Sequence, residues 1–191
     1  MVHGWAFDFD DTIVTTTACI QTTSHGRLTT AEYARHRGTP LALHQGSFKE
    51  LDSDACELRP AGAYGLWRRA LKTRQPMIIL TARACNSKII MSLLRRSLGL
   101  RKGSPVRLHR NIKVLSVNSP SCLKAFSKRY PTAASRKYAV LKNHMRKHAW
   151  DRATFVDDDL RNLRAVGRLG KRVELRSGRT ARKLRPCQKT L

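Results

Sequence analysis

Two aspartates follow a hydrophobic run close to the start of the chain. Residues 5–12 read Trp-Ala-Phe-Asp-Phe-Asp-Asp-Thr, so Asp8 and Asp10 stand two positions apart. Side chains alternate along a strand, so these aspartates are expected on one side and Phe7 and Phe9 on the other, facing a core. Two carboxylates this close repel each other unless a cation or a shared proton offsets the charge. A hydrated divalent metal ion at the carboxyl end of a strand is the simplest solution, and it indicates phosphate chemistry.

Strand-like and helical segments alternate along the rest of the chain. The strand-like runs are residues 5–9, 77–81, 106–108, 114–117, 154–157 and 172–175. Helical patterns cover residues 30–37, 63–73, 87–98 and 135–148. This alternation predicts an α/β fold, in which helices flank a parallel sheet and ligands bind at the carboxyl ends of the strands.

Two segments interrupt the alternation. Residues 13–60 are rich in Thr, Gly and His and predict a small inserted cap or flap after the first strand. Residues 101–134 are basic and contain three prolines, which predicts a second, loop-rich excursion. We therefore expect a single domain over residues 1–175, followed by a basic tail over residues 176–191.

The formal net charge of +25 over 191 residues is the second unusual feature. No acidic residue occurs between Glu57 and Asp151, whereas that interval holds 22 lysines and arginines. Because unrelieved like charge destabilises a compact chain, this excess indicates a polyanionic partner, and nucleic acid, DNA or RNA, is the leading candidate. A membrane partner is not expected, since no apolar stretch reaches about 18 residues and no segment combines basic residues with an apolar helical face and a lipidation signal. A solubility adaptation is the alternative explanation.

The cysteines are five in number, widely spaced and without a Cys-x-x-Cys pair. Neither a structural zinc site nor a disulfide framework is expected, which favours the cytoplasm or another reducing compartment. Cys85 is interpreted as a small buried residue and not as a nucleophile. The N-terminus lacks the basic start and apolar stretch of a signal peptide, so the protein is not expected to be secreted.

Three segments resemble the motifs of the haloacid dehalogenase-like (HAD) superfamily. Residues 8–12, Asp-Phe-Asp-Asp-Thr, match its Asp-x-Asp-x-Thr signature. Residues 78–83, Ile-Ile-Leu-Thr-Ala-Arg, are similar to its second motif, an apolar strand that ends in Thr or Ser. Residues 155–158, Phe-Val-Asp-Asp, followed by Asn162, resemble its fourth motif. The resemblance covers residues 5–162 and implies a HAD-like, Rossmann-type sheet.

The resemblance also implies roles for four aspartates. Asp8 would be the nucleophile that forms an aspartyl-phosphate, and Asp10 would act first as general acid and then as general base. The Asp8 carboxylate and the backbone carbonyl of Asp10 would bind Mg²⁺, a cation that prefers oxygen ligands. Asp158 would be a further metal ligand, and Asp157 would orient it or bind the metal through water.

Two threonines and an arginine complete the motifs. Thr81 would donate a hydrogen bond to a phosphoryl oxygen, as the resemblance implies. Thr12 is expected to support the loop that holds Asp10. Thr12 and Arg83 are also candidate substrate-binding residues.

The third motif of this superfamily is a lysine that neutralises the phosphate and the nucleophile. Lys137 lies 20 residues before Asp157 at the predicted start of a helix, and Lys142 lies further into the same helix. Residues at a helix start lie nearest the sheet edge where ligands bind, which favours Lys137 over Lys142 as the catalytic lysine.

Together these features predict a magnesium-dependent phosphomonoesterase that acts on a nucleotide or on a nucleic-acid terminal phosphate. A cap that closes over the site would favour a mononucleotide, and an open one would admit a polynucleotide end; the basic charge favours the second. The alternative is a HAD-like domain that binds nucleic acid as a structural component of a ribonucleoprotein or virion assembly. Against it, the acids of the site are all present although they repel one another.

Overall fold

The computed structural model describes residues 1–178 except 24, 36–47, 54, 85–86 and 101–111. Its centre is a parallel sheet of five strands in the order β7-β6-β1-β8-β9. The strands are β1 (His3–Phe7), β6 (Met77–Thr81), β7 (Ile112–Ser116), β8 (Arg152–Asp157) and β9 (Val173–Ser177). The predicted α/β class with a parallel sheet is confirmed.

The strand order places the first strand of the sheet in its middle. Counted along the chain, the order is third, second, first, fourth, fifth, which is compatible with a Rossmann-like, doubly wound sheet. The order reverses between β1 and β8, and ligands of such sheets bind outside the carboxyl ends of the strands at this point. Asp8 follows β1 directly and Asp157 ends β8, so both lie where this topology forms a site.

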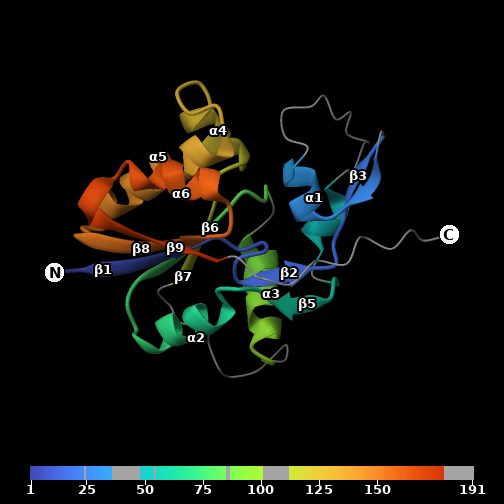
Figure 1. The fold of residues 1–191 in the computed structure, drawn as a ribbon, viewed down its shortest axis with the longest axis horizontal. Coiled ribbons are helices and arrows are strands. Elements are labelled where there is room, and N and C mark those ends of the chain that lie inside the picture. The colour runs from blue at the N-terminus through green and yellow to red at the C-terminus, as the bar shows by residue number, and fades with distance from the viewer. Residues whose placement is uncertain (24, 36–47, 54, 85–86, 101–111, 179–191) are drawn as a thin grey trace.

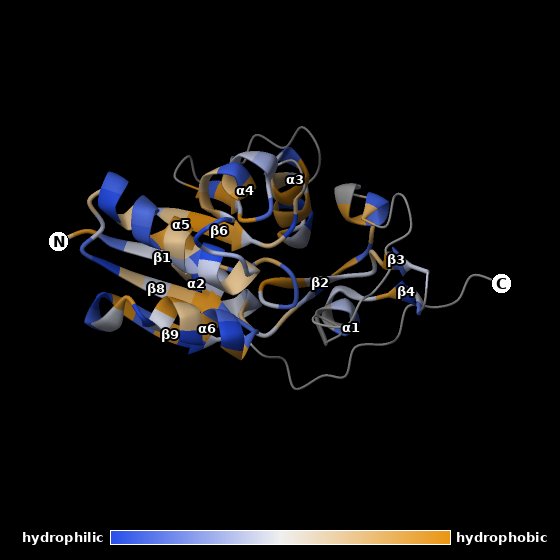
Figure 2. Cartoon of the chain, turned by 90° about the horizontal axis from the view of Figure 1, so that it is seen from above, coloured by the Kyte–Doolittle hydropathy of each residue, from blue (hydrophilic) through white to orange (hydrophobic). Residues whose placement is uncertain are grey.

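Helices cover both faces of the sheet (Figure 1). One face carries α4 (Pro120–Phe126), α5 (Ala133–Lys147) and α6 (Leu160–Gly167), and the other carries α2 (Tyr64–Lys72) and α3 (Ser87–Ser97). A short 3₁₀ helix, η2 (Gly170–Arg172), leads into β9. In Figure 2 the apolar residues of the helices turn toward the strands, and their polar residues turn outward.

Strand alternation divides the core into two layers. Phe7 and Phe9 are fully buried on the side of α2 and α3, where they pack with Trp67. Ala6 and Phe155 are fully buried on the side of α5 and α6. The prediction that Phe7 and Phe9 face a core is therefore confirmed.

The segment predicted as an insertion forms small antiparallel elements of its own. It contains β2 (Val14–Thr16), β3 (Ile20–Thr22), β4 (Gly26–Leu28), α1 (Thr30–Arg35), η1 (Lys49–Asp52) and β5 (Leu58–Pro60). β2 pairs with β5 and β3 with β4, so the chain leaves the sheet after β1 and returns beside its point of departure. The start of α1 is capped as its Thr-Thr-Ala-Glu sequence predicts, because Thr29 and Glu32 exchange hydrogen bonds.

The structure differs from the sequence prediction at several boundaries. β1 and β8 begin two residues earlier than predicted, and β9 runs through Ser177, two residues into the segment assigned to the tail. Helix α4 lies in a segment whose prolines predict loops, and Pro120 is one of them. It is the first residue of the helix, where its missing N–H costs nothing, and Ser119 caps the helix by accepting a hydrogen bond from the Cys122 N–H. The predicted strand at 106–108 and most of the predicted tail lie outside the described residues.

Two further findings concern the sequence predictions. Among the helices that the structure describes, none combines the length and the apolar character that a membrane crossing requires.

Cys56 and Cys122 are free thiols, but Cys19 is disulfide-bonded, which the sequence did not predict. The prediction for Cys85 lies outside the described residues.

Candidate active site

The site begins with the pairing of β1 and β8. Phe7 pairs with Val156, and the Asp8 N–H donates a hydrogen bond of 2.9 Å to the Val156 carbonyl. This pairing places Asp8 beside Asp157 at the carboxyl edge of the sheet. Two acids that are 149 positions apart in the sequence thus become neighbours because parallel strands end at one edge.

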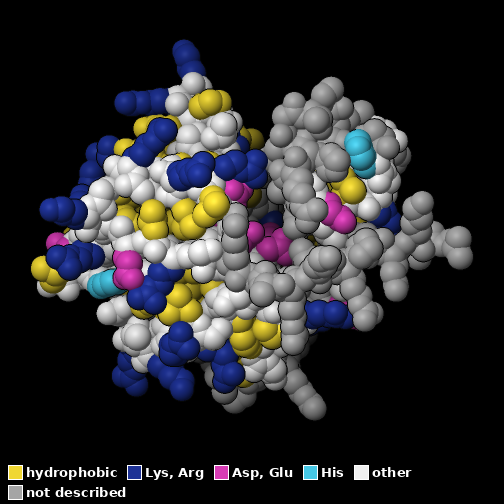
Figure 3. All heavy atoms as spheres, viewed as in Figure 1, with side chains coloured by type: hydrophobic (Ala, Val, Ile, Leu, Met, Phe, Trp, Pro, Cys, Tyr) yellow, Lys and Arg dark blue, Asp and Glu magenta, His cyan; other side chains and the backbone are white. Residues whose placement is uncertain are grey.

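Three carboxylates gather at this edge. Asp8, Asp157 and Asp158 each offer an oxygen within 4.8 Å of the others, so the group could hold a metal ion. Asp157 is fully buried, Asp8 is 8% exposed and Asp158 is half-buried. In Figure 3 acidic side chains lie near the centre of the visible face, while lysines and arginines spread over the surrounding surface.

A buried lysine lies between two of these acids. The Lys137 Nζ lies 2.8 Å from Asp8 Oδ1 and 2.7 Å from Asp157 Oδ2, and the side chain is 1% exposed. Burial alone would lower the pKa of Lys137, but the charges of Asp157 and Asp8 raise it above its usual value, so the ammonium stays protonated. Lys142 is exposed, with its Nζ over the ring of Tyr138. Of the two lysines considered, Lys137 is therefore the one at Asp8.

Two carboxylates of this cluster have raised pKa values. Asp8, Asp157 and Asp158 lie close together, and the Lys137 ammonium contacts the first two. Burial, together with the charges of Asp157 and Asp158, raises the pKa of Asp8 well above its usual value although Lys137 opposes the shift. Burial and Asp157 also raise the pKa of Asp158. Three carboxylate oxygens within 4.8 Å of one another fit a hard divalent cation.

Neighbouring groups fix the two acids that end β8. Asp157 accepts hydrogen bonds from the Asn162 side-chain amide at 2.9 and 3.0 Å and from the Asp159 N–H at 2.9 Å. Asp159 instead caps α6, where it accepts from the Arg161 N–H and forms an ion pair with the Arg161 guanidinium. The third acid of the run is thus part of the helix cap and lies outside the group of three.

The side chain of Thr12 contacts Asp158. Its hydroxyl donates to Asp158 Oδ1 at 2.9 Å and accepts from the Asp158 N–H at 3.0 Å, and the side chain is fully buried. The hydroxyl thus positions Asp158, and the expectation that Thr12 supports the loop holding Asp10 stays a prediction. Gly178 lies against the same threonine: a Cβ at Gly178 would come within 2.8 Å of Thr12 Cγ2. This contact was missed, and a glycine directly after a strand of the sheet is the only sequence signal for it.

Asp10 lies outside the three-carboxylate group and pairs with Arg83. The guanidinium donates to Asp10 from Nε at 2.8 Å and from a terminal nitrogen at 2.6 Å. Arg83 also donates to the Leu51 carbonyl at 2.9 Å and to the Thr16 hydroxyl at 3.1 Å, so it ties Asp10 to the insertion. The roles of Asp10 in acid–base chemistry and of Arg83 in substrate binding stay predictions.

The turn after β6 is held by β7 and the segment that follows it. Thr81 is fully buried, and its hydroxyl accepts a hydrogen bond of 3.1 Å from the Arg83 N–H. The Asn118 amide donates to the Ala82 carbonyl at 2.6 Å, and the Ser116 hydroxyl donates to the Arg83 carbonyl. The role of Thr81 toward a phosphoryl oxygen stays a prediction.

Asp11 is a further, half-buried acid, which sequence reasoning did not separate from its neighbours. Its backbone has a φ of 59°, a conformation that aspartate tolerates better than most residues. Burial and the charge of Asp10 raise its pKa to about 6, although the Thr30 hydroxyl donates to Asp11 Oδ2 at 3.0 Å. The contact joins the loop after β1 to the start of α1 in the insertion.

Comparison with known proteins identifies no family for this chain. No protein-family model matches the chain, and no curated protein sequence is significantly similar to it.

Proposed function

We propose that this protein is a magnesium-dependent phosphohydrolase of the HAD type that works through an aspartyl-phosphate. One observation carries the proposal: the buried Lys137 ammonium lies between Asp8 and Asp157, and a third carboxylate, Asp158, offers an oxygen within 4.8 Å of theirs. Carboxylates this close repel one another, and a divalent cation bound by their oxygens would offset that repulsion. The grouping of three acids around one buried lysine therefore supports a metal-dependent reaction at Asp8.

The residues present fit the expected metal. Asp8 and Asp158 would hold Mg²⁺ together with the backbone carbonyl of Asp10, and Asp157 would orient them or bind through water. When bound, the ion would offset the repulsion between an anionic nucleophile and an anionic phosphate. Because Asp8 and Asp158 have raised pKa values, protons would compete with the cation, and metal affinity would fall as the pH is lowered.

The chain's own residues supply the two chemical steps. An Asp8 oxygen attacks phosphorus, the bond from phosphorus to the leaving oxygen breaks, and Asp10 gives that oxygen a proton. Water then attacks phosphorus and gives a proton to Asp10, and the bond from phosphorus to Asp8 breaks to release phosphate. Lys137 holds Asp8 in place and stabilises the anionic phosphoryl group. In this structure Arg83 holds the Asp10 carboxylate, so Asp10 must turn from Arg83 toward the leaving group.

A nucleotide or the terminal phosphate of a polynucleotide is the substrate class that the charge favours. The net charge of +25 exceeds what a small phosphate ester requires and suits a polyanion. The insertion contacts the site through Arg83, whose guanidinium binds Leu51 and Thr16 as well as Asp10. We expect it to act as the cap or flap that limits substrate size.

Phosphate release from a generic aryl phosphate tests the proposal. The wild-type chain is expected to release phosphate when Mg²⁺ is present, and the Asp8→Asn variant is expected to lose this activity while its circular dichroism spectrum is unchanged. Equal rates in both would rule out Asp8 as nucleophile. Absence of activity on every phosphomonoester, combined with tight and salt-sensitive nucleic-acid binding, would favour the structural ribonucleoprotein or virion component instead.

A further inference from the structure

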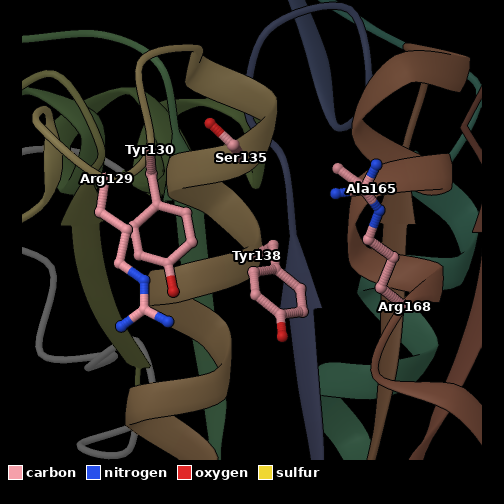
Figure 4. Close-up of a pocket in the computed structure, with 6 residues that line it drawn as sticks. All are labelled: Arg129, Tyr130, Ser135, Tyr138, Ala165 and Arg168. Carbon is pink, nitrogen blue, oxygen red and sulfur yellow. The ribbon is translucent and has the colours of Figure 1, made fainter.

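A pocket of about 270 Å³ lies beside α5, between the segment that precedes this helix and α6. Its lining residues are Arg129, Tyr130, Ser135, Tyr138, Ala165 and Arg168. Figure 4 shows the two tyrosines side by side, with Arg129 on one side and Arg168 across from Tyr138. The buried Lys137 immediately precedes Tyr138 in α5, so the pocket adjoins the helix that supplies the lysine of the proposed active site.

Two aromatic rings form the middle of the pocket. Tyr130 and Tyr138 are half-buried, and their ring centroids lie 6.1 Å apart at an angle of 52°. Phe126 packs against Tyr130 with a centroid distance of 6.2 Å and supports that ring from α4. Half-buried aromatic rings offer faces on which unpaired nucleobases stack without regard to sequence, and Tyr138 is held on α5.

Cations accompany both rings. The Arg129 guanidinium carbon lies 5.7 Å from the Tyr130 ring centroid, and the Lys142 Nζ lies 5.7 Å from that of Tyr138. Arg129 and Arg168 are exposed, and neither forms an ion pair with an acid in the described part of the chain. None of the six lining residues is acidic. Cations beside stacking faces suit the phosphates that flank a base.

We propose that this pocket binds one nucleotide of a single-stranded nucleic acid, with the base on Tyr130 and Tyr138 and the flanking phosphates at Arg129 and Arg168. A single strand is favoured over a duplex because duplex bases are already stacked and cannot reach a tyrosine face. An acidic peptide would satisfy the arginines but would leave the rings without a partner. The inference deepens the proposed function, since it makes a polynucleotide the substrate class, but the binding itself requires no catalysis.

Fluorescence anisotropy with the full chain and a labelled single-stranded oligothymidylate of about ten nucleotides tests the proposal. Tyr130→Ala and Tyr138→Ala are each expected to weaken binding at least about fivefold, whereas the two Tyr→Phe variants keep the ring and bind like wild type. Arg168→Ala is expected to weaken binding and to lower the slope of log affinity against log salt by about one. Arg152→Ala removes an equal, exposed charge at the opposite end of β8 and serves as the control.

The outcomes separate this inference from the proposed function. Release of phosphate from an aryl phosphate is expected to be unchanged in all of these variants. If the wild-type protein releases no phosphate but binds the oligonucleotide as predicted, the proposed phosphatase activity is refuted and the proposed binding pocket is not. The pocket is refuted if the Tyr→Ala variants bind the oligonucleotide like wild type, or if Arg168→Ala loses no more affinity than Arg152→Ala. It is also refuted if polyglutamate of equal charge competes as well as the oligonucleotide does.

Discussion

Replacing Lys137 with methionine removes the only cation that contacts both Asp8 and Asp157 among the described residues. Met fills a similar volume, so the main effect is the loss of charge between a fully buried Asp157 and a nearly buried Asp8. Breaking a buried ion pair by removing one partner costs about 3–5 kcal/mol. With a urea m-value of about 2–3 kcal/mol per molar, the unfolding midpoint should fall by about 1–2.5 M at neutral pH.

The pH dependence of this loss distinguishes a charge effect from a packing effect. Without the ammonium, the pKa of Asp8 rises further above its unfolded value, so the folded state is penalised wherever that carboxyl is ionised. The penalty is therefore largest above the raised pKa and shrinks as the pH falls toward about 4. Urea denaturation of wild type and Lys137→Met across this range measures it, and addition of Asp157→Asn to the variant should recover part of the lost stability.

Lys142→Met is the matched control, because Lys142 lies on the same helix but is exposed. We expect its free energy of unfolding to lie within about 0.5 kcal/mol of wild type. The reasoning is wrong if the two variants lose equal stability, or if the loss in Lys137→Met does not change with pH.

Other predictions concern the residues around the cluster. Thr12→Val removes both hydrogen bonds to Asp158 and should weaken Mg²⁺ binding about 10- to 100-fold, as measured by isothermal titration calorimetry. Thr12→Ser keeps the hydroxyl and should bind Mg²⁺ like wild type. Equal Mg²⁺ affinities of the Val and Ser variants would contradict the role of the hydroxyl. Asp11 has a folded pKa of about 6, above its unfolded value, so its contribution to stability is lost as the pH rises through 6. The free energy of unfolding of Asp11→Asn should therefore exceed that of wild type by on the order of 2 kcal/mol at about pH 8 and equal it at about pH 4. Urea denaturation at both pH values measures this, and a difference that does not change with pH would contradict the prediction.

The convergence of the acids could be predicted because it follows from simple geometry. Asp8 and Asp157 each end an apolar run that is buried in a parallel sheet, and parallel strands present their carboxyl ends at one edge. Lys137 could be preferred over Lys142 by its place at a helix start, and the structure confirms its position beside Asp8.

The contacts that hold the site together could not be predicted, because they depend on side-chain placement between distant segments. Thr12 and Asp158 are separated by 146 residues, and Arg83 reaches back 73 residues to Asp10. The hydrophobic periodicity of the sequence does not indicate such side-chain pairs. Helix α4 was missed for a different reason, since Pro120 stops a helix in its interior but suits its first turn.

Trapping the covalent intermediate is the most direct test of the proposed chemistry. Wild-type protein would be mixed with substrate and Mg²⁺, quenched in acid within milliseconds, digested and analysed by mass spectrometry. We expect one phosphate on the peptide that contains Asp8, and none on that peptide in Asp8→Asn. Steady release of phosphate without this adduct, or with the adduct on another residue, would contradict the assignment of Asp8 as nucleophile.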